Sequence, residues 1–275
     1  MTKDFYNEVY QVGHESKYDG GPDGIPERIN ILWQQTDSWL IDTSLKIKSD
    51  AKILEIGSGM SFLSKIHPGW HGAEYSSRAV ERVKNRDGAH TLIFEEDVEC
   101  LSFANEYFDG VFSWATLEHV PDPNKGFCEI DRVLQKGGYA LLAPAWHCRP
   151  WTVKKLEARP WLELSFLEKL ERLSIPIREH IVFRASLALF QRCWSEFSMW
   201  RTGNKEVSLR YRKLYPSWEL IKQFGHVSDD DAVADIDSHA AILFFQSRGY
   251  KIISHPSFLH RMFARHEPVS VQKPL

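Results

Sequence analysis

The chain has 275 residues, of which 43% are hydrophobic and 26% charged, and its formal net charge is −3. This composition is ordinary for a folded protein, and the weak negative charge argues against a nucleic-acid-binding protein. No segment approaches the roughly 20 consecutive apolar residues that span a bilayer, and the first residues carry no secretory signal. The four cysteines are far apart in the sequence, which argues against a disulfide framework or a metal site and favours a cytoplasmic location.

The first half of the chain alternates predicted helices and strands. The spacing of Ile29, Trp33 and Leu40 predicts an amphipathic helix from Pro26 to about Ser49. Apolar runs predict strands at 51–56, 72–75, 91–94, 110–114 and 139–143, and periodic segments predict helices at 61–66, 78–85 and 124–135. This alternation favours an α/β fold with a parallel sheet and helices on both of its faces.

The second half begins with a different texture. Residues 146–235 are rich in Trp, Arg and Leu and mostly helical in period. One apolar stripe recurs at three- and four-residue steps through Phe183, Leu187, Phe190, Trp194 and Phe197. The sequence then predicts a helix over 237–248, strands at 250–254 and 258–264, and a frayed end.

The sharpest local motif is Glu55-Ile-Gly57-Ser-Gly59, directly after the first predicted strand. Two glycines there let the chain turn sharply and let its backbone approach a ligand that a Cβ would exclude. A second acidic residue, Glu74, lies 17 positions after Gly57, at the predicted end of the next strand. A carboxylate at that place can accept hydrogen bonds from both hydroxyls of a ribose, although a solvated surface glutamate is the alternative interpretation.

Further motifs follow in a fixed order: Glu96-Asp97-Val98, then FDGVFSWATLEHVPDP from Phe108, then EIDRVLQKGG from Glu129. This order and spacing resemble the class I methyltransferases of the type 11 group, over residues 51–145 and, more loosely, 236–265. The resemblance implies a Rossmann-like, doubly wound, mostly parallel seven-stranded sheet, with a helical insertion before the last helix and β-hairpin. It divides the chain into a core of 1–145 and 236–275, in which 1–50 form an N-terminal cap, and an insert of 146–235 that acts as a substrate lid.

The same resemblance implies S-adenosylmethionine as the cofactor and no metal. It places Glu55, Gly57 and Gly59 against the methionine part, Glu74 on the ribose, Asp97 and Val98 on the adenine, and Ser113, Trp114 and Ala115 beside the sulfonium. Two departures from the family are visible. Ser61 stands where the family often has glycine, and only ten residues separate Gly59 from Trp70, which makes the first crossover unusually short.

Two histidines are candidates for the general base that an acceptor hydroxyl would need. His119 follows the fourth predicted strand of the core and His147 follows the fifth, where ligands bind in such sheets. A capping or packing histidine is the alternative for His119, whereas His147 stands where the insert meets the core. Tyr6 and Tyr10 are either a cover over the cofactor or ordinary packing aromatics.

The insert also suggests a partner. Residues 151–215 hold thirteen Lys or Arg and seven Glu, whereas the remainder holds 21 basic and 30 acidic residues. A basic insert can attract an acidic substrate, and a solvated helix surface is the alternative. The aromatic stripe predicts the core of a helical lid, with a homodimer face or a membrane-surface contact as alternatives. Contact with RNA is disfavoured, because the net charge is −3 and the chain lacks a recognisable RNA-binding module; its candidate residues are Arg210, Arg212 and Lys213 with Tyr211 and Tyr215.

We therefore expect transfer of a methyl group from S-adenosylmethionine to a small-molecule acceptor, either acidic, a sugar or a secondary metabolite. The alternatives are a non-catalytic methyltransferase-like binding protein and an RNA or protein methyltransferase. An NAD-dependent oxidoreductase is disfavoured, because Phe62 stands where its fingerprint requires a third glycine.

Overall fold

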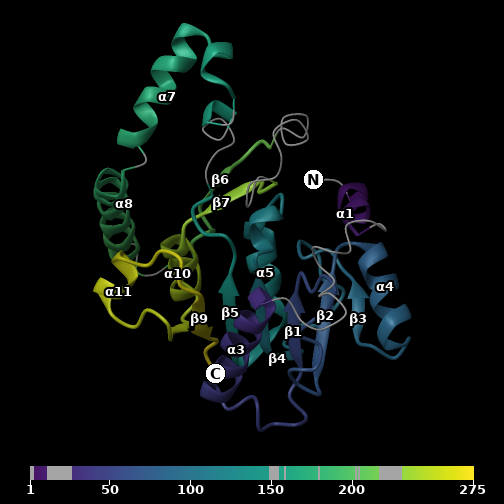
Figure 1. Ribbon diagram of the computed structural model, residues 1–275. Helices are drawn as coiled ribbons and strands as arrows, with labels where there is room; N and C mark the ends of the chain where they lie inside the picture. The colour runs from purple at the N-terminus through teal and green to yellow at the C-terminus, as the bar shows by residue number, and fades with distance from the viewer. Residues whose placement is uncertain are drawn as a thin grey trace.

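The computed structural model describes residues 3–10, 27–148, 155–157, 159–178, 180–201, 203, 205–216 and 231–275. Its centre is a seven-stranded sheet in the order β3-β2-β1-β4-β5-β9-β8 (Figure 1). The strands are β1 (Ile53–Ile56), β2 (Trp70–Glu74), β3 (Ile93–Glu95), β4 (Phe108–Trp114), β5 (Leu134–Ala143), β8 (Lys251–Ile252) and β9 (Val269–Gln272). The first five are parallel, and β9 runs antiparallel to both of its neighbours, β5 and β8. The predicted doubly wound, mostly parallel sheet is confirmed.

Alternate residues of the central strands bury two different faces. Leu54 of β1 and Val111 of β4 belong to the core under α5 (Pro123–Val133) and α10 (Ser238–Gln246), which contribute Phe127, Ile130, Phe244 and Phe245. Ile53 and Phe112 belong to the opposite core, which α3 (Glu27–Asp42) and α4 (Ser77–Asp87) cover. Successive side chains of a strand point to opposite faces of the sheet. Because both faces are buried here, the sequences of β1 and β4 are nearly continuous apolar runs.

The first crossover contains no helix, so the prediction of a helical piece over 61–66 is wrong. Ser64 and Ile66 donate backbone hydrogen bonds three residues back, to Ser61 and Leu63, which makes a series of turns. With ten residues between Gly59 and Trp70, the chain returns to the start of β2 before a helix can form. Helix α3 also ends earlier than predicted, at Asp42, and Pro26 lies outside the described residues.

Two predictions at the C-terminal end are wrong. The segment predicted as a strand over 258–264 is a short helix, α11 (Phe258–Met262), which begins because the Ser257 side chain accepts a hydrogen bond from the His260 amide. The end predicted to fray instead forms β9, whose Val269–Gln272 pair with β5. Three of these four residues are buried, so the strand completes the sheet.

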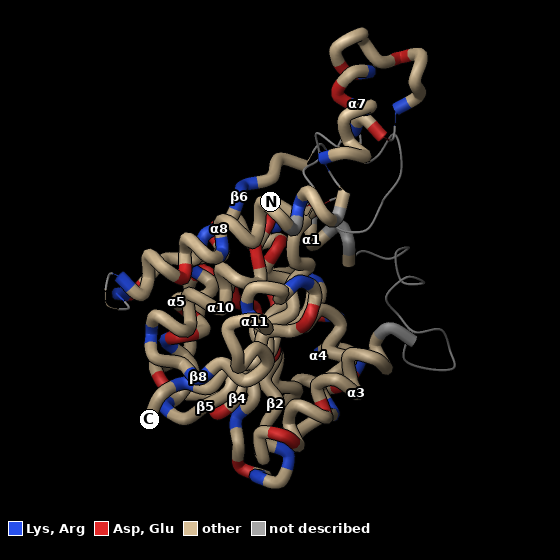
Figure 2. Tube along the Cα trace, turned by 90° about the vertical axis from the view of Figure 1, so that its left-hand side faces the viewer, with Lys and Arg blue, Asp and Glu red and all other residues tan. Residues whose placement is uncertain are grey.

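The insert is not purely helical. It contains the short helix η2 (Trp161–Glu163) and the long helices α7 (Phe166–Arg178) and α8 (Ile181–Arg201), but β6 (Tyr211–Lys213) also pairs antiparallel with β7 (Ala234–Ile236). Helix α7 projects beyond the sheet and its covering helices (Figure 2). The aromatic side chains of the α8 stripe are exposed to solvent. The prediction that this stripe forms the core of a helical lid is therefore wrong for the described residues. None of the described helices could span a bilayer.

Candidate functional site

The glycine loop lies at the carboxyl end of β1, beside the end of β4. Gly57 has a φ of 72°, and a Cβ on it would lie 2.0 Å from Oγ1 of Thr116. Both the left-handed backbone and this close approach require glycine. Ser61 adopts a φ of 55°, which explains why a glycine suits that position. The loop is therefore held against the residues that follow β4.

Glu74, at the end of β2, ties the same loop to the neighbouring strand. Its Oε2 accepts a hydrogen bond of 2.8 Å from the Gly59 amide, and its Oε1 accepts one of 2.8 Å from the Ser76 amide. The side chain is buried, and burial raises the pKa of the carboxyl. Each oxygen keeps a further lone pair, so the group can still accept hydrogen bonds from a ligand. The structure brings together the two motifs that the sequence singled out.

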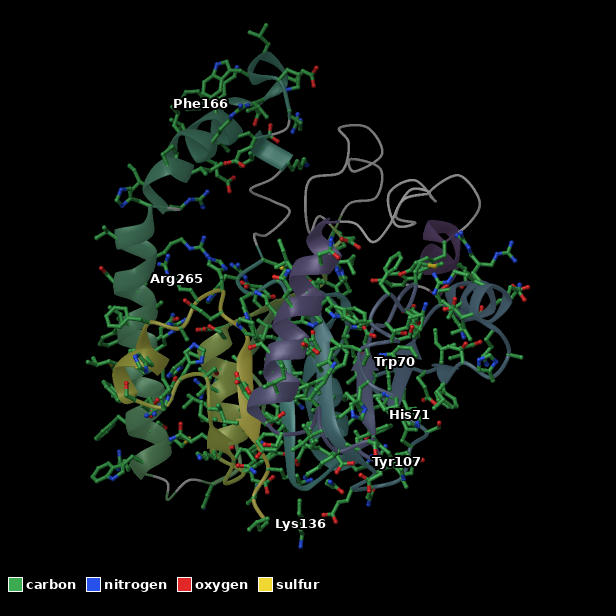
Figure 3. The ribbon with its side chains drawn as sticks, turned by 60° about the horizontal axis from the view of Figure 1, so that its bottom comes forward. Trp70, His71, Tyr107, Lys136, Phe166 and Arg265 are labelled. Carbon is green, nitrogen blue, oxygen red and sulfur yellow. The ribbon has the colours of Figure 1, made fainter. Side chains whose placement is uncertain are left out.

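Glu55 points into the core beneath the loop. Its Oε2 accepts a hydrogen bond of 2.8 Å from Nε1 of Trp70, which lies at the start of β2 (Figure 3). Burial raises the pKa of the Glu55 carboxyl to about 8, against the opposing effect of that hydrogen bond. The Glu55 carboxyl is therefore protonated and neutral near pH 7 when no cation lies beside it.

The other predicted cofactor residues surround the same edge of the sheet. After β3, Asp97 is exposed and accepts from the Glu99 amide, while Val98 is half-buried against the α5 core. At the end of β4, the Ser113 hydroxyl donates to the Ile56 carbonyl at 3.1 Å, next to the glycine loop. Trp114 turns toward α3 and donates from Nε1 to Oγ1 of Thr36 at 3.0 Å. Ala115 is exposed with a φ of 46°, at the point where the chain leaves the sheet.

An acidic cluster forms above this edge. His119 lies between two carboxylates, with Nε2 3.7 Å from Oε1 of Glu118 and Nδ1 3.5 Å from Oδ2 of Asp231. Glu118 is fully buried. Tyr6, on helix α1 (Lys3–Val9), lies near these carboxylates. Burial is the main cause that raises the pKa of its hydroxyl, and the nearby Asp231, Glu74 and Glu118 raise it further. The edge therefore has a negative potential that suits a cationic ligand.

The N-terminal helix α1 reaches the same place. Asn7 accepts a hydrogen bond of 2.8 Å from the Ser76 hydroxyl, and the Tyr6 and Tyr75 rings meet edge to face at 6.2 Å. A Cβ on Gly59 would lie 3.1 Å from the Tyr10 hydroxyl. Tyr6 and Tyr10 thus lie beside the glycine loop and Glu74.

His147 belongs to a different cluster. Its Nε2 lies 3.8 Å from Oδ1 of Asp237, its ring lies 6.2 Å from that of His266, and its φ is 60°. Burial lowers the pKa of His147, although Asp237 opposes the shift. Asp237 is itself bound by Arg192 at 2.7 Å. The two predicted base residues thus have separate sets of neighbours.

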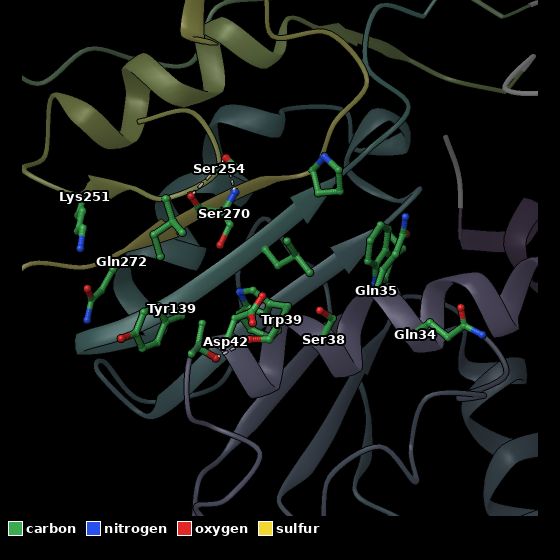
Figure 4. Close-up of a pocket in the computed structure, with 15 residues that line it drawn as sticks. Gln34, Gln35, Ser38, Trp39, Asp42, Tyr139, Lys251, Ser254, Ser270 and Gln272 are labelled. Carbon is green, nitrogen blue, oxygen red and sulfur yellow. Dashed lines mark hydrogen bonds between the residues drawn. The ribbon is translucent and has the colours of Figure 1, made fainter. Parts of the chain in front are cut away.

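A groove of about 630 Å³ runs along the α3 side of the sheet, from Trp114 to Lys251 (Figure 4). Its walls include the rings of Trp39 and Tyr139. Nε1 of Trp39 and Oγ of Ser270 are buried there without a hydrogen-bond partner among the described residues. The volume is within the range of small-molecule sites, and the walls combine aromatic surface with polar groups.

Three comparisons bear on the class of protein. Residues 54–142 match the family model described as a methyltransferase domain. The chloroplastic 2-methyl-6-phytyl-1,4-hydroquinone methyltransferase 2 of Oryza sativa subsp. japonica is 26% identical over 118 residues, which are 40% of this chain. The match covers 34% of that relative's length.

Among solved structures, a SAM-dependent methyltransferase from Thermotoga maritima covers 87% of this chain and 94% of its own, at 16% identity and a TM-score of 0.41. CalS10, an amino pentose methyltransferase from Micromonospora echinaspora, covers 48% of this chain and 56% of its own, at 17% identity and a TM-score of 0.37.

The family match identifies residues 54–142 as a methyltransferase domain, and S-adenosylmethionine is the cofactor that the resemblance to class I methyltransferases implies. Four features of the structure fit this cofactor. A Cβ on Gly59 would have the Tyr10 hydroxyl as its nearest neighbour, at 3.1 Å, Glu74 retains acceptor capacity, and the surrounding carboxylates suit a sulfonium cation. The buried Ser61 hydroxyl in the same loop has no hydrogen-bond partner among the described residues. These groups can hold an amino acid, a ribose and a positive charge.

Sequence reasoning missed part of the acidic cluster. Glu118 gave a signal, because it is a charged residue between apolar Leu117 and the buried Val120. Asp231 gave none, because it lies in an acidic run more than a hundred positions from His119. Its contact with the histidine depends on the path of the insert.

Proposed function

We propose that this chain transfers a methyl group from S-adenosylmethionine to a small-molecule acceptor. One observation carries the proposal: the Glu74 carboxylate is bound to the Gly59 amide where β1 and β2 end side by side. In doubly wound sheets, ligands bind outside the carboxyl ends of the strands, and an acid at this position accepts from ribose hydroxyls. When bound, the cofactor supplies a methyl group that its sulfonium charge has already activated.

The proposed roles of the binding residues follow the sheet edge. Glu55, Gly57 and Gly59 form the methionine subsite and Glu74 holds the ribose. Asp97 and Val98 contact the adenine. The residues that lie beside the sulfonium are Ser113, Trp114 and Ala115. Their support is that all of these residues lie at or just beyond the carboxyl ends of β1 to β4.

His119 is the first choice for the general base. A histidine imidazole can take a proton from an acceptor hydroxyl, and the Glu118 and Asp231 carboxylates lie 3.7 Å and 3.5 Å from the two ring nitrogens of His119. His147 is the second choice, because burial keeps its imidazole neutral and Arg192 already occupies the neighbouring Asp237.

A small-molecule acceptor is supported by the groove that begins at Trp114, whose volume suits a small ligand. We further propose that 1–145 and 236–275 form the catalytic core and that the insert of 146–235 limits access to the acceptor. We infer a cytoplasmic location from the four cysteines, which are all free thiols.

The test is a transfer assay with methyl-labelled S-adenosylmethionine and a panel of carboxylic acids, sugars and phenols. We expect S-adenosylhomocysteine release with at least one acceptor class. For a hydroxyl acceptor, His119→Gln should lower kcat by about 10²–10⁴-fold at unchanged cofactor affinity. His90→Gln, an exposed histidine after α4, is the matched control. Label found only on RNA or protein, or cofactor binding without any transfer, would overturn the proposal.

A further inference from the structure

Helix α8 is packed with its polar side inward. Arg192 is 5% exposed, and it donates to Asp237 at 2.7 Å and to the Met262 carbonyl at 2.6 Å. Glu196, one turn later on the same side, accepts from Nε of Arg261 at 2.8 Å. The contacts between α8 and the body of the protein are thus built largely from hydrogen-bonded charges.

The opposite side of α8 is apolar and faces solvent. Phe190 is 75% exposed and Trp194 is 62% exposed. The exposed stripe consists of Phe183, Leu187, Phe190, Trp194, Phe197 and Trp200. A surface helix of a soluble domain normally has the reverse arrangement, with its apolar stripe on the core and its charges in water. The stripe therefore needs a partner outside this chain's described residues.

Exposed apolar side chains also occur on α7 and α11, which both contact α8. Helix α7 exposes Phe166 at its far end (Figure 3), followed by Leu170, Leu173 and Ile177, and α11 exposes Phe258 and Leu259. We call the exposed sides of α7, α8 and α11 together the outer face. Large exposed apolar patches mark sites of protein or membrane contact.

The charges around the outer face distinguish these two partners. Within α8 and α11 the one carboxylate is Glu196, and it is turned inward toward Arg261 and His239. The exposed charged or ionisable side chains of these two helices are Arg201, His260 and Arg184, the last of which lies near His147 and Asp235 on the body side of α8. On α7, both glutamates already pair with arginines, Glu168 with Arg159 and Glu171 with Arg178.

A second copy of this chain would bring Arg201 and His260 against their own equivalents, and α8 and α11 provide no exposed carboxylate to pair with them. Anionic lipid headgroups complement both features, because they attract the basic side chains while Phe, Leu and Trp enter the boundary of the acyl chains. We propose that the outer face docks this protein on an anionic lipid surface, with α8 lying along the plane of the membrane. The proposal goes beyond the methyl transfer and does not depend on it.

The test is co-sedimentation of the full chain with vesicles of phosphatidylcholine alone and of equal parts phosphatidylcholine and phosphatidylglycerol. We expect binding to the mixed vesicles that weakens as salt is raised, and much weaker binding to phosphatidylcholine. Each aromatic anchor removed should weaken binding about tenfold, so Phe190→Ser with Trp194→Ser should weaken it about 100-fold. Ile41→Ser with Ile47→Ser is the control, because both side chains are exposed and lie outside the outer face.

Because Phe190 and Trp194 are exposed, the double variant should retain the unfolding temperature of the parent. Three results would overturn the proposal. The first is the absence of binding by the folded parent, and the second is equal, salt-independent binding to both vesicles. The third is a dimer in analytical ultracentrifugation that dissociates in the double variant and does not bind vesicles, which would identify the partner as a second copy.

Discussion

Gly57 gives the sharpest test of the glycine loop. Gly57→Ala places a Cβ at a φ of 72°, which costs about 1–2 kcal/mol because the left-handed region disfavours L residues. The same Cβ would lie 2.0 Å from Oγ1 of Thr116 and within 2.7 Å of two further atoms of that side chain. Overpacking of this kind costs about a further 1–3 kcal/mol. We therefore expect a total loss of about 2–5 kcal/mol.

The assay is thermal unfolding, in which this loss corresponds to a fall in Tm of about 5–15 °C. Gly249→Ala is the matched control, because Gly249 has a φ of 80° but its Cβ would make only an ordinary contact of 3.8 Å, with Pro274. It should lose only the backbone part, and Thr116→Ala should recover the overpacking part in the Gly57→Ala background. Equal losses for Gly57→Ala and Gly249→Ala would refute the close approach of the loop to the end of β4.

Two further predictions concern buried charges. Because the folded-state pKa of Glu55 is about 8 and an unfolded glutamate titrates near ~4.3, the stability from this group is full below about pH 4 and is lost as pH rises through 8. Glu55→Gln keeps a hydrogen-bond acceptor for Trp70. Its urea midpoint should equal that of the parent near pH 4 and exceed it at pH 8. A difference in midpoint that does not change with pH would refute the raised pKa of Glu55. Arg192→Met should cost about 2–3 kcal/mol, because Asp237 loses its arginine partner. Phe190→Ser should change stability by less than about 0.5 kcal/mol in the same urea titration, because Phe190 is exposed. The reverse order of these two losses would contradict the orientation of α8.

The part of the fold that sequence predicts best is the part governed by local pattern. The apolar runs of β1 and β4, the glycines between β1 and the first crossover, and the amphipathic α5 each follow from neighbouring residues. Glu74 was also predictable, because the length of a strand and crossover fixes where the next strand ends. The contact between Glu74 and Gly59 confirms that the two motifs lie together.

The parts that sequence did not predict depend on contacts between distant segments. The period of α8 identifies an apolar stripe but not the side on which the protein lies, and Arg192 reaches Asp237, 45 positions away. The segment 258–264 has an apolar content that suits either strand or helix, and the Ser257 cap decides for α11. The pairing of β9 with β5 requires a return of more than a hundred residues, which no local pattern encodes.

The most direct test of the cofactor site is calorimetric titration of the purified, cofactor-free chain with S-adenosylhomocysteine. We expect saturable one-site binding, which Glu74→Ala should abolish and Glu81→Ala should leave unchanged, because Glu81 is an exposed residue of α4. Folded protein that binds no S-adenosylhomocysteine, or Glu74→Ala that binds it as well as the parent, would contradict the site at the ends of β1 and β2.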